Sequence, residues 1–252
     1  MATRVIDDTK LQNIAVAIQG KDSGGTMTVD EMPTRIAAIQ TGDEVLFSSY
    51  GRQYTRTVEI PDGVIVLGSF AFENCRGLTN ITFPDRLTTI DQYGFDGCTG
   101  LTEIDLKNVT TIGQAAFRNC TGLTNITFPD SLTTIIQYAF QNCTGLTNID
   151  LKNVTTIGRF AFNGCPRLSL IDLTSRATPT TLDNTNSFSY TNNTWIAVVA
   201  NDTIKSDFQN ATNWSTFASH FRTIAEVEAE VGMTYDEYYY QLFGEPRNEV
   251  TP

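Results

Sequence analysis

The sequence predicts an α/β solenoid, a fold in which short repeated coils stack in one direction, for three reasons. Its five cysteines recur at an almost constant interval, as Cys75, Cys98, Cys120, Cys143 and Cys165. Segments 78–122 and 123–167 are identical at 33 of their 45 paired positions, so a unit of two coils has been duplicated. Each coil also contains a short stretch of alternating apolar and polar residues, the pattern of a half-buried strand. A fixed period of this kind indicates coils that bury their apolar faces on one another.

Each coil begins with a strand and ends with a turn. In the coil that starts at Leu78, Ile81 and Phe83 share one face and Asn80 and Thr82 the other. Pro84 stops the strand because proline cannot donate to a sheet ladder. A Thr-Gly pair at the end of the coil lets the chain turn into the next strand. We expect a ladder of phenylalanines to fill the interior, one per layer: Phe72, Phe95, Phe117, Phe140 and Phe162.

The cysteines occupy one equivalent position in successive coils. Five is an odd number for a disulfide framework, and the chain has no CxxC pair of the kind that binds zinc. We therefore expect a ladder of buried, reduced thiols that pack as small hydrophobes, assembled in a reducing cytoplasm.

The coil pattern LxxIxFPxxLTTIxxxAFxxC resembles the BspA-like branch of the leucine-rich repeats over about residues 55–221. The resemblance implies a right-handed, curved array with a parallel sheet on its concave side and short helices capping both ends. The repeat diverges after the LSLIDL motif, at about residue 174. Residues 195–221 resemble the terminal coil of such arrays, a strand followed by a helix, which would cover the exposed end of the sheet.

Two flanks lie outside the predicted solenoid, which gives three regions: 1–44, 45–222 and 223–252. In the first, Leu11, Ile14 and Ile18 lie at helical spacing, and a capping box predicts a second helix over Thr28–Ile39, interrupted by Pro33. This segment resembles a short module of bacteriophage tail and other structural proteins. The apolar face of Leu11, Ile14 and Ile18 has no repeat to pack on unless it folds back onto an end of the solenoid, so we expect this segment to mediate attachment or oligomerisation. The resemblance implies that the attachment is to other virion proteins and that a homo-oligomer would be a trimer.

The C-terminal region predicts two short acidic helices. A Thr-x-x-Glu capping box opens each, at Thr223 and at Thr234, and a glycine ends each, at Gly232 and at Gly244. The second helix is rich in tyrosine.

Composition and charge argue against several classes of function. With 17 Lys and Arg against 28 Asp and Glu, the net charge is −11, which repels nucleic-acid backbones. No stretch approaches the roughly 18 apolar residues of a membrane span, and the first residues contain no apolar core of a signal peptide. The single histidine, His220, has no second base with which to build a catalytic pair. We therefore predict a non-enzymatic protein without a cofactor or metal.

Two surfaces compete as the binding site. The first is a polar column on the concave face, which we predict to bind the ligand: Thr57, Glu59, Asn80, Thr82, Glu103, Asp105, Asn125, Thr127, Asn148, Asp150 and Asp172. Asp150 and Asp172 would lie about 5 Å apart on neighbouring strands and could hold a cation, although the Asn and Thr residues favour a solvated polar face. The second is an aromatic stripe that either makes contacts or only seals the convex wall: Phe70, Tyr93, Tyr138 and Phe160.

The function that these observations predict is that of a binding module in a bacteriophage or prophage virion. It would serve as a tail fibre, receptor-binding or decoration protein that recognises a host-surface protein or glycan. Two alternatives stay open: a BspA-like adhesin on the bacterial cell surface, and a structural spacer without a ligand.

Overall fold

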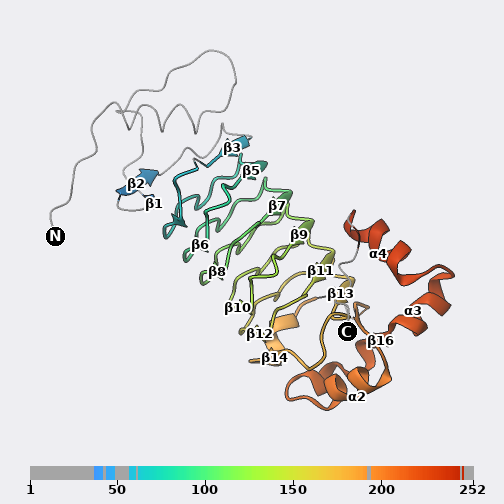
Figure 1. Ribbon diagram of the computed structural model, residues 1–252. Helices are drawn as coiled ribbons and strands as arrows, with labels where there is room; N and C mark the ends of the chain where they lie inside the picture. The colour runs from blue at the N-terminus through green and yellow to red at the C-terminus, as the bar shows by residue number, and fades with distance from the viewer. Residues whose placement is uncertain are drawn as a thin grey trace.

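The structure is a computed structural model that describes residues 57–60, 62–191, 194–244 and 246, and the backbone of 37–41 and 44–48. Its centre is a stack of similar coils, as the repeat predicts (Figure 1). Each coil from Thr57 to Leu182 contributes a longer strand to one wall and a two-residue strand to another. The predicted α/β solenoid with a parallel concave sheet is therefore confirmed.

The longer strands form the concave face, which carries the predicted polar column. In chain order they are β3 (Thr57–Glu59), β5 (Asn80–Thr82), β7 (Glu103–Asp105), β9 (Asn125–Thr127), β11 (Asn148–Asp150), β13 (Leu170–Asp172), β15 (Ile196–Val199) and β16 (Phe221–Thr223). Their ladders are parallel and in register, so that Ile104 pairs with Ile126 and Ile149 with Ile171. These isoleucines point into the core, which leaves the residues on either side of them for the outer face.

The two-residue strands form a second parallel row. They are β4 (Val66–Leu67), β6 (Thr89–Ile90), β8 (Thr111–Ile112), β10 (Thr134–Ile135), β12 (Thr156–Ile157) and β14 (Thr181–Leu182). A hairpin of β1 (Ala37–Thr41) and β2 (Glu44–Ser48) pairs antiparallel with β4 and covers the edge of this row. The helix expected over Thr28–Ile39 is therefore wrong for its last three residues, because pairing with β4 overrides local helix propensity. The rest of that helix, and Leu11, Ile14 and Ile18, lie outside the described residues.

The predicted phenylalanine ladder is confirmed. Successive rings from Phe72 to Phe162 are buried and stack with centroids 5.1–5.5 Å apart. Phe188, in the segment where the repeat diverges, adds one more ring 5.5 Å beyond Phe162. Trp195 and Trp214 then close the end of the column, and the Trp214 indole N–H donates to the Thr180 carbonyl (2.6 Å). Full burial of each ring contributes about 1.5–3 kcal/mol to folding.

The predicted ladder of buried, reduced cysteines is also confirmed. Each thiol after the first donates a weak hydrogen bond to a phenylalanine carbonyl of the preceding coil, as Cys98 Sγ does to Phe72 (3.0 Å). Burial raises the pKa of Cys75 and of Cys165 to about 12. These thiols are therefore poor nucleophiles.

The C-terminal part contains the 3-10 helix η2 (Thr185–Phe188), α2 (Asp202–Asn210), the 3-10 helix η3 (Trp214–His220), α3 (Ile224–Val231) and α4 (Tyr235–Phe243). Strand β15 followed by α2 is the predicted terminal coil. Both capping boxes form, and Gly232 and Gly244 end their helices in the left-handed conformation with φ of 73° and 74°. None of the described helices combines the length and apolar character that crossing a membrane requires.

Candidate binding surfaces

The first half of the polar column is exposed, as predicted. It consists of Asn80, Thr82, Glu103, Asp105, Asn125 and Thr127, on strands β5, β7 and β9, and we call it the open half of the concave face. Glu103 lies beside Asn125 and Asp105 beside Thr127 in the ladder. Thr57 and Glu59 extend the column at the backbone level, because they pair with Asn80 and Thr82. Short parallel strands thus present these polar side chains at a regular spacing of about 4.8 Å.

The second half of the column is covered, which corrects the expectation of a solvated face. Asn148 and Asp150 are 6% exposed and Asp172 is 1% exposed. Helix α4 lies over them: the Tyr239 hydroxyl donates to Asp150 Oδ2 (2.7 Å), and the Tyr235 hydroxyl donates to Asp172 Oδ2 (3.1 Å). The sequence contains one indication of this contact. Tyr235 and Tyr239 lie one helical turn apart, which matches the one-coil separation of Asp172 and Asp150.

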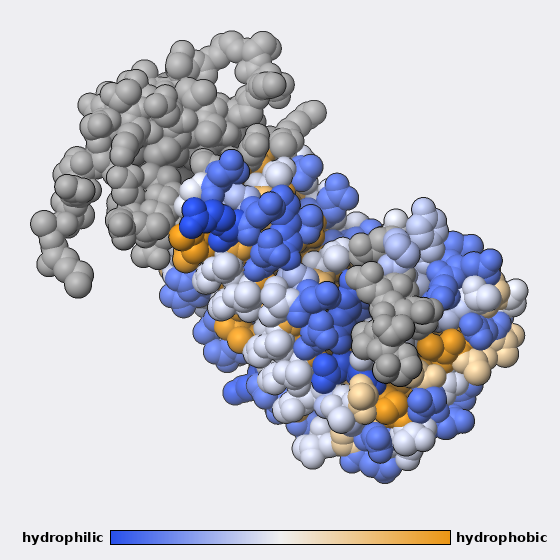
Figure 2. Space-filling view, in the orientation of Figure 1, coloured by the Kyte–Doolittle hydropathy of each residue, from blue (hydrophilic) through white to orange (hydrophobic). Residues whose placement is uncertain are grey.

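A small apolar cluster supports the same contact. Leu170 and Val198, which occupy the column positions where earlier coils have polar residues, are buried against Val227, Tyr235 and Tyr239. This cluster is separate from the main core of the coils. Figure 2 shows hydrophobic side chains reaching the surface at this C-terminal end of the molecule, near α3. Helices α3 and α4, which we call the C-terminal tail, are thus held by a few apolar contacts together with two hydrogen bonds to carboxylates.

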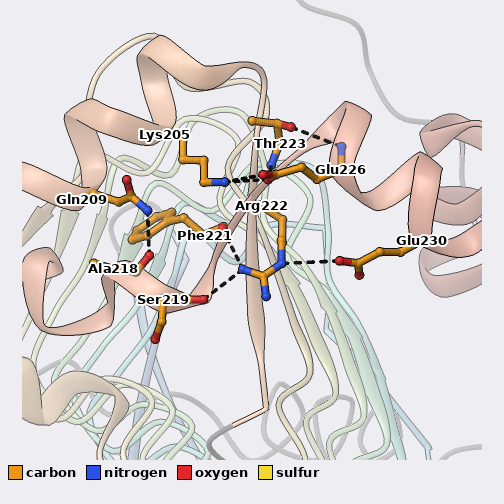
Figure 3. A network of polar contacts seen from close by, with 9 residues as sticks. All are labelled: Lys205, Gln209, Ala218, Ser219, Phe221, Arg222, Thr223, Glu226 and Glu230. Atoms are coloured by element: carbon orange, nitrogen blue, oxygen red, sulfur yellow. Dashed lines mark hydrogen bonds and ion pairs between the residues drawn. The ribbon is translucent and has the colours of Figure 1, made fainter.

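A polar network fixes the point where the tail leaves the solenoid (Figure 3). Glu226 in α3 accepts hydrogen bonds from the Thr223 backbone N–H (2.7 Å) and from Lys205 Nζ in α2 (2.6 Å). The hydrogen bond from Lys205 is the main reason that the pKa of Glu226 is lowered. Arg222 Nη1 donates to the Ser219 carbonyl (2.9 Å), and its Nε lies 3.6 Å from Glu230 Oε1. The direction of α3 is therefore set by its junction with the terminal coil.

One of the covered carboxylates, Asp150, has a strongly raised pKa. Burial raises the pKa of Asp150 to about 7, and the charge of Asp172 on the neighbouring strand contributes to this rise. The hydrogen bonds from Tyr239 and from the Lys152 backbone N–H (2.9 Å), and the Lys152 ammonium 3.9 Å from Oδ2, act in the opposite direction. In the part of the chain that the structure describes, no group of three or more metal-ligating side chains is found. The tyrosine hydroxyls bind the carboxylate oxygens that would otherwise be open to a cation.

A hollow of about 320 Å³ lies where α4 meets the open half. Phe243, at the last turn of α4, forms one wall. The other walls come from β5, β7 and β9, including Glu103, Asp105 and Asn125, and from Lys107. The hollow therefore combines an aromatic ring with carboxylates, an amide and an ammonium group.

The aromatic stripe consists of two stacked pairs of rings. The rings of Phe70 and Tyr93 lie 5.1 Å apart, and those of Tyr138 and Phe160 lie 5.3 Å apart. Between the pairs stands the buried Ala115, and the guanidinium of Arg118 lies 5.1 Å above the Tyr93 ring. Phe70 alone of these rings is more than one-third exposed, at 44%. This stacking favours the sealing role, because the ring faces contact each other.

The one histidine has a packing role in the terminal coil. His220 Nδ1 donates to the Trp195 carbonyl (2.7 Å), and the two rings stack with centroids 4.1 Å apart. This orientation directs the imidazole to a backbone group instead of a nucleophile.

The sequence profile of the family described as BspA type leucine-rich repeat region matches six copies over residues 47–169 and 104–216. The matches cover more than half of the chain, which therefore belongs to the BspA-type leucine-rich repeat family. No curated protein matches it.

Solved structures of other leucine-rich repeat proteins are similar to this chain. One, from Eubacterium ventriosum, has 22% identity and a TM-score of 0.49 and covers 62% of this chain. The chain spans 50% of that protein's length. A leucine-rich repeat protein from T. pallidum has 30% identity and a TM-score of 0.44, covering 57% of this chain and 71% of its own. A leucine-rich cell surface protein from Faecalibacterium prausnitzii has 19% identity and a TM-score of 0.34, covering 60% and 61%.

Proposed function

We propose that this protein is a non-enzymatic binding module that recognises a surface protein or glycan through the open half of its concave face. The observation that carries the proposal is the contrast within one column. Leu170 and Val198 are buried under the chain's own tail, whereas Glu103, Asp105 and Asn125 stay exposed on equally regular strands. A rigid sheet with exposed polar groups can hold a partner without a large ordering cost.

Binding of the fluorescently labelled chain to intact bacterial cells tests this function. A Glu103→Ala, Asp105→Ala, Asn125→Ala triple variant should lose binding, and a variant with Arg167→Ala, Asp183→Ala and Asp202→Ala, all exposed elsewhere, should retain it. Protease treatment of the cells removes a protein receptor, and periodate oxidation removes a glycan receptor. If the first triple variant binds as well as the parent, the open half is not the site. If the parent binds nothing, the protein is a spacer.

As the location of this module, we propose a bacteriophage or prophage virion. The resemblance of the N-terminal segment to phage tail and structural proteins supports this placement, and that segment would attach the chain to other virion proteins. The alternative is a bacterial surface adhesin, the role implied by the resemblance to BspA-like proteins. Mass spectrometry of purified particles from an induced culture, compared with peptides released from intact cells by protease, separates the two locations.

We also propose that the N-terminal segment joins the chain into a homo-oligomer, with a trimer as the arrangement common among virion appendages. The apolar spacing of Leu11, Ile14 and Ile18 supports this. Light scattering of the full chain should give a mass that is a multiple of 27.8 kDa. The combined substitutions Leu11→Ser, Ile14→Ser and Ile18→Ser should reduce it to the mass of one chain. A monomer in both cases would oppose self-association.

A further inference from the structure

We propose that the open half of the concave face binds an α-helix of a partner protein that lies in line with α4 and donates a tyrosine hydroxyl to Asp105, as Tyr239 does to Asp150. The inference rests on the proposed function of this face and specifies the class of ligand. Three observations carry it: the way α4 lies on the sheet, the duplication of the site that α4 occupies, and the charge of the part that stays open.

Helix α4 matches the sheet because a helical turn and a strand spacing are similar lengths. One turn rises about 5.4 Å, and neighbouring strands lie about 4.8 Å apart. Tyr235 therefore meets Asp172 on β13, and Tyr239, one turn later, meets Asp150 on β11. Phe243, another turn later, reaches the hollow that β9 lines with Asn125 and Thr127. A helix in this direction places one side chain on each strand.

The site under Tyr239 has an internal copy in the open half. Residues 101–109 and 146–154 differ at one position of nine, LTEIDLKNV against LTNIDLKNV, so Asp105 corresponds to Asp150. The two aspartates have the same orientation, because Lys107 N donates to Asp105 Oδ1 at 2.9 Å and Lys152 N donates to Asp150 Oδ1 at 2.9 Å. In Asp150 the other oxygen, Oδ2, accepts the tyrosine hydroxyl. Asp105 is exposed, and its Oδ2 has no such donor among the described residues.

Charge identifies the occupant as a partner and not a second copy of α4. The open half carries Glu103 and Asp105, and α4 carries the exposed Asp236 and Glu237 in a chain of net charge −11. A second α4 would bring like charges together. The open half also lacks equivalents of Leu170 and Val198, so the incoming helix gains less from apolar burial. A neutral or basic helix that carries the tyrosine avoids the repulsion between like charges, and Phe243 offers it an apolar contact.

Synthetic peptides test the proposal on the full chain. The probe is a short alanine- and lysine-based helical peptide with one central tyrosine, and its matched control has phenylalanine at that position. We expect saturable binding of the tyrosine peptide, with amide shifts in NMR spectra on β5, β7 and β9. Binding of the phenylalanine peptide should be about tenfold weaker, as expected for loss of a hydrogen bond to a charged group.

Variants of the protein locate the contact. Asp105→Asn should weaken the tyrosine peptide about tenfold more than the phenylalanine peptide, which loses only the attraction between its lysines and one carboxylate. Asp62→Asn, the same charge change at another exposed position, should affect neither peptide. Asp105→Glu, which keeps the charge but displaces the oxygen, should also weaken binding. Equal affinity for the two peptides, or an unchanged affinity of the Asp105→Asn variant, overturns the inference. Cell binding that is lost after periodate, with no peptide binding, overturns it too but leaves the proposed function of the face intact.

Discussion

The phenolic oxygen of Tyr239 lies 2.7 Å from Oδ2 of Asp150, which stands far earlier in the chain, and donates a hydrogen bond to it. This contact belongs to the small cluster under α4 and not to the stacked core of the coils. The attachment of the tail can therefore be weakened without disturbing the phenylalanine ladder, which allows the two parts to be tested separately.

Removal of this hydroxyl should loosen α4 locally. Tyr239→Phe leaves a buried carboxylate oxygen without its donor, which costs about 1–3 kcal/mol. Hydrogen exchange of the α4 amides should become faster by the corresponding factor, and exchange in the coils should not change. Tyr240→Phe is the matched control, because Tyr240 is 58% exposed on the same helix. Equal effects of the two substitutions would show that the hydroxyl of Tyr239 does not hold the helix.

Attachment of the tail should weaken as the pH rises. The pKa of Asp150 is raised from 3.8 to about 7 when α4 covers it, so the covered state binds a proton that the released state has lost. Stability then falls with pH wherever the native state binds more protons. Protection of α4 should be greatest below about pH 4, decline between about pH 4 and 7 and level off above that range. Groups facing Asp150 that set this range are Asp172, Lys152 and Tyr239.

Hydrogen exchange from mildly acidic to mildly alkaline pH, corrected for the intrinsic rates, measures this dependence. Asp150→Asn, which cannot ionise, should make the protection of α4 much less dependent on pH. Tyr239→Phe should move the decline to higher pH, since the tyrosine hydrogen bond lowers the pKa of Asp150. Protection that increases with pH in the parent chain contradicts the assignment.

A ring in the core and a polar side chain on the outer face should differ in their effect on stability. Phe117→Ala should cost about 3–5 kcal/mol, because it leaves a cavity between the rings of Phe95 and Phe140. Asn125→Ala, on the exposed face of β9, should change the free energy of unfolding by no more than about 0.5 kcal/mol. Urea denaturation of the two variants measures both values. A large cost at Asn125 would mean that this side chain has a structural role.

The five thiols should resist alkylation in the folded protein. Cys75 is 4% exposed and the other four are fully buried, and burial raises the pKa of every one of them. Iodoacetamide at mildly alkaline pH should modify none within the time in which a denatured sample reacts completely, as followed by mass spectrometry. Rapid modification of Cys120 or Cys143 without unfolding would be inconsistent with a closed middle layer.

The repeat predicts which residues of each coil are buried and which form its strand. The strands, the phenylalanine ladder and the buried cysteines therefore follow from the sequence. Phe188 could not be placed in the ladder, since the interval from Phe162 is longer than the repeat and the intervening segment has lost the pattern. The strand at Ala37–Thr41 forms by pairing with β4, which local propensity does not indicate.

The candidate site is predicted in part for the same reason. Alternation places Asn125 and Asp150 alike on the outer face, and this is correct for the direction of both side chains. The alternation does not reveal that Asn125 is exposed and Asp150 is buried. That difference arises from helix α4, which is distant in the sequence from both strands, through contacts that no local pattern encodes. The only indication of this contact in the sequence is that the separation of the two tyrosines matches the separation of the two aspartates.

The near-identity of segments 78–122 and 123–167 makes the length of this molecule adjustable. Because each coil contacts only its neighbours, a further unit of two coils could be inserted between them without a change at either end. Such an insertion would lengthen the sheet by about 10 Å, two strand spacings, and would add another aspartate equivalent to Asp105. The tail would still reach Asp172 and Asp150, since these lie in the coils nearest to it. Recombination between the copies would therefore change the length of the exposed polar surface by whole units of two coils.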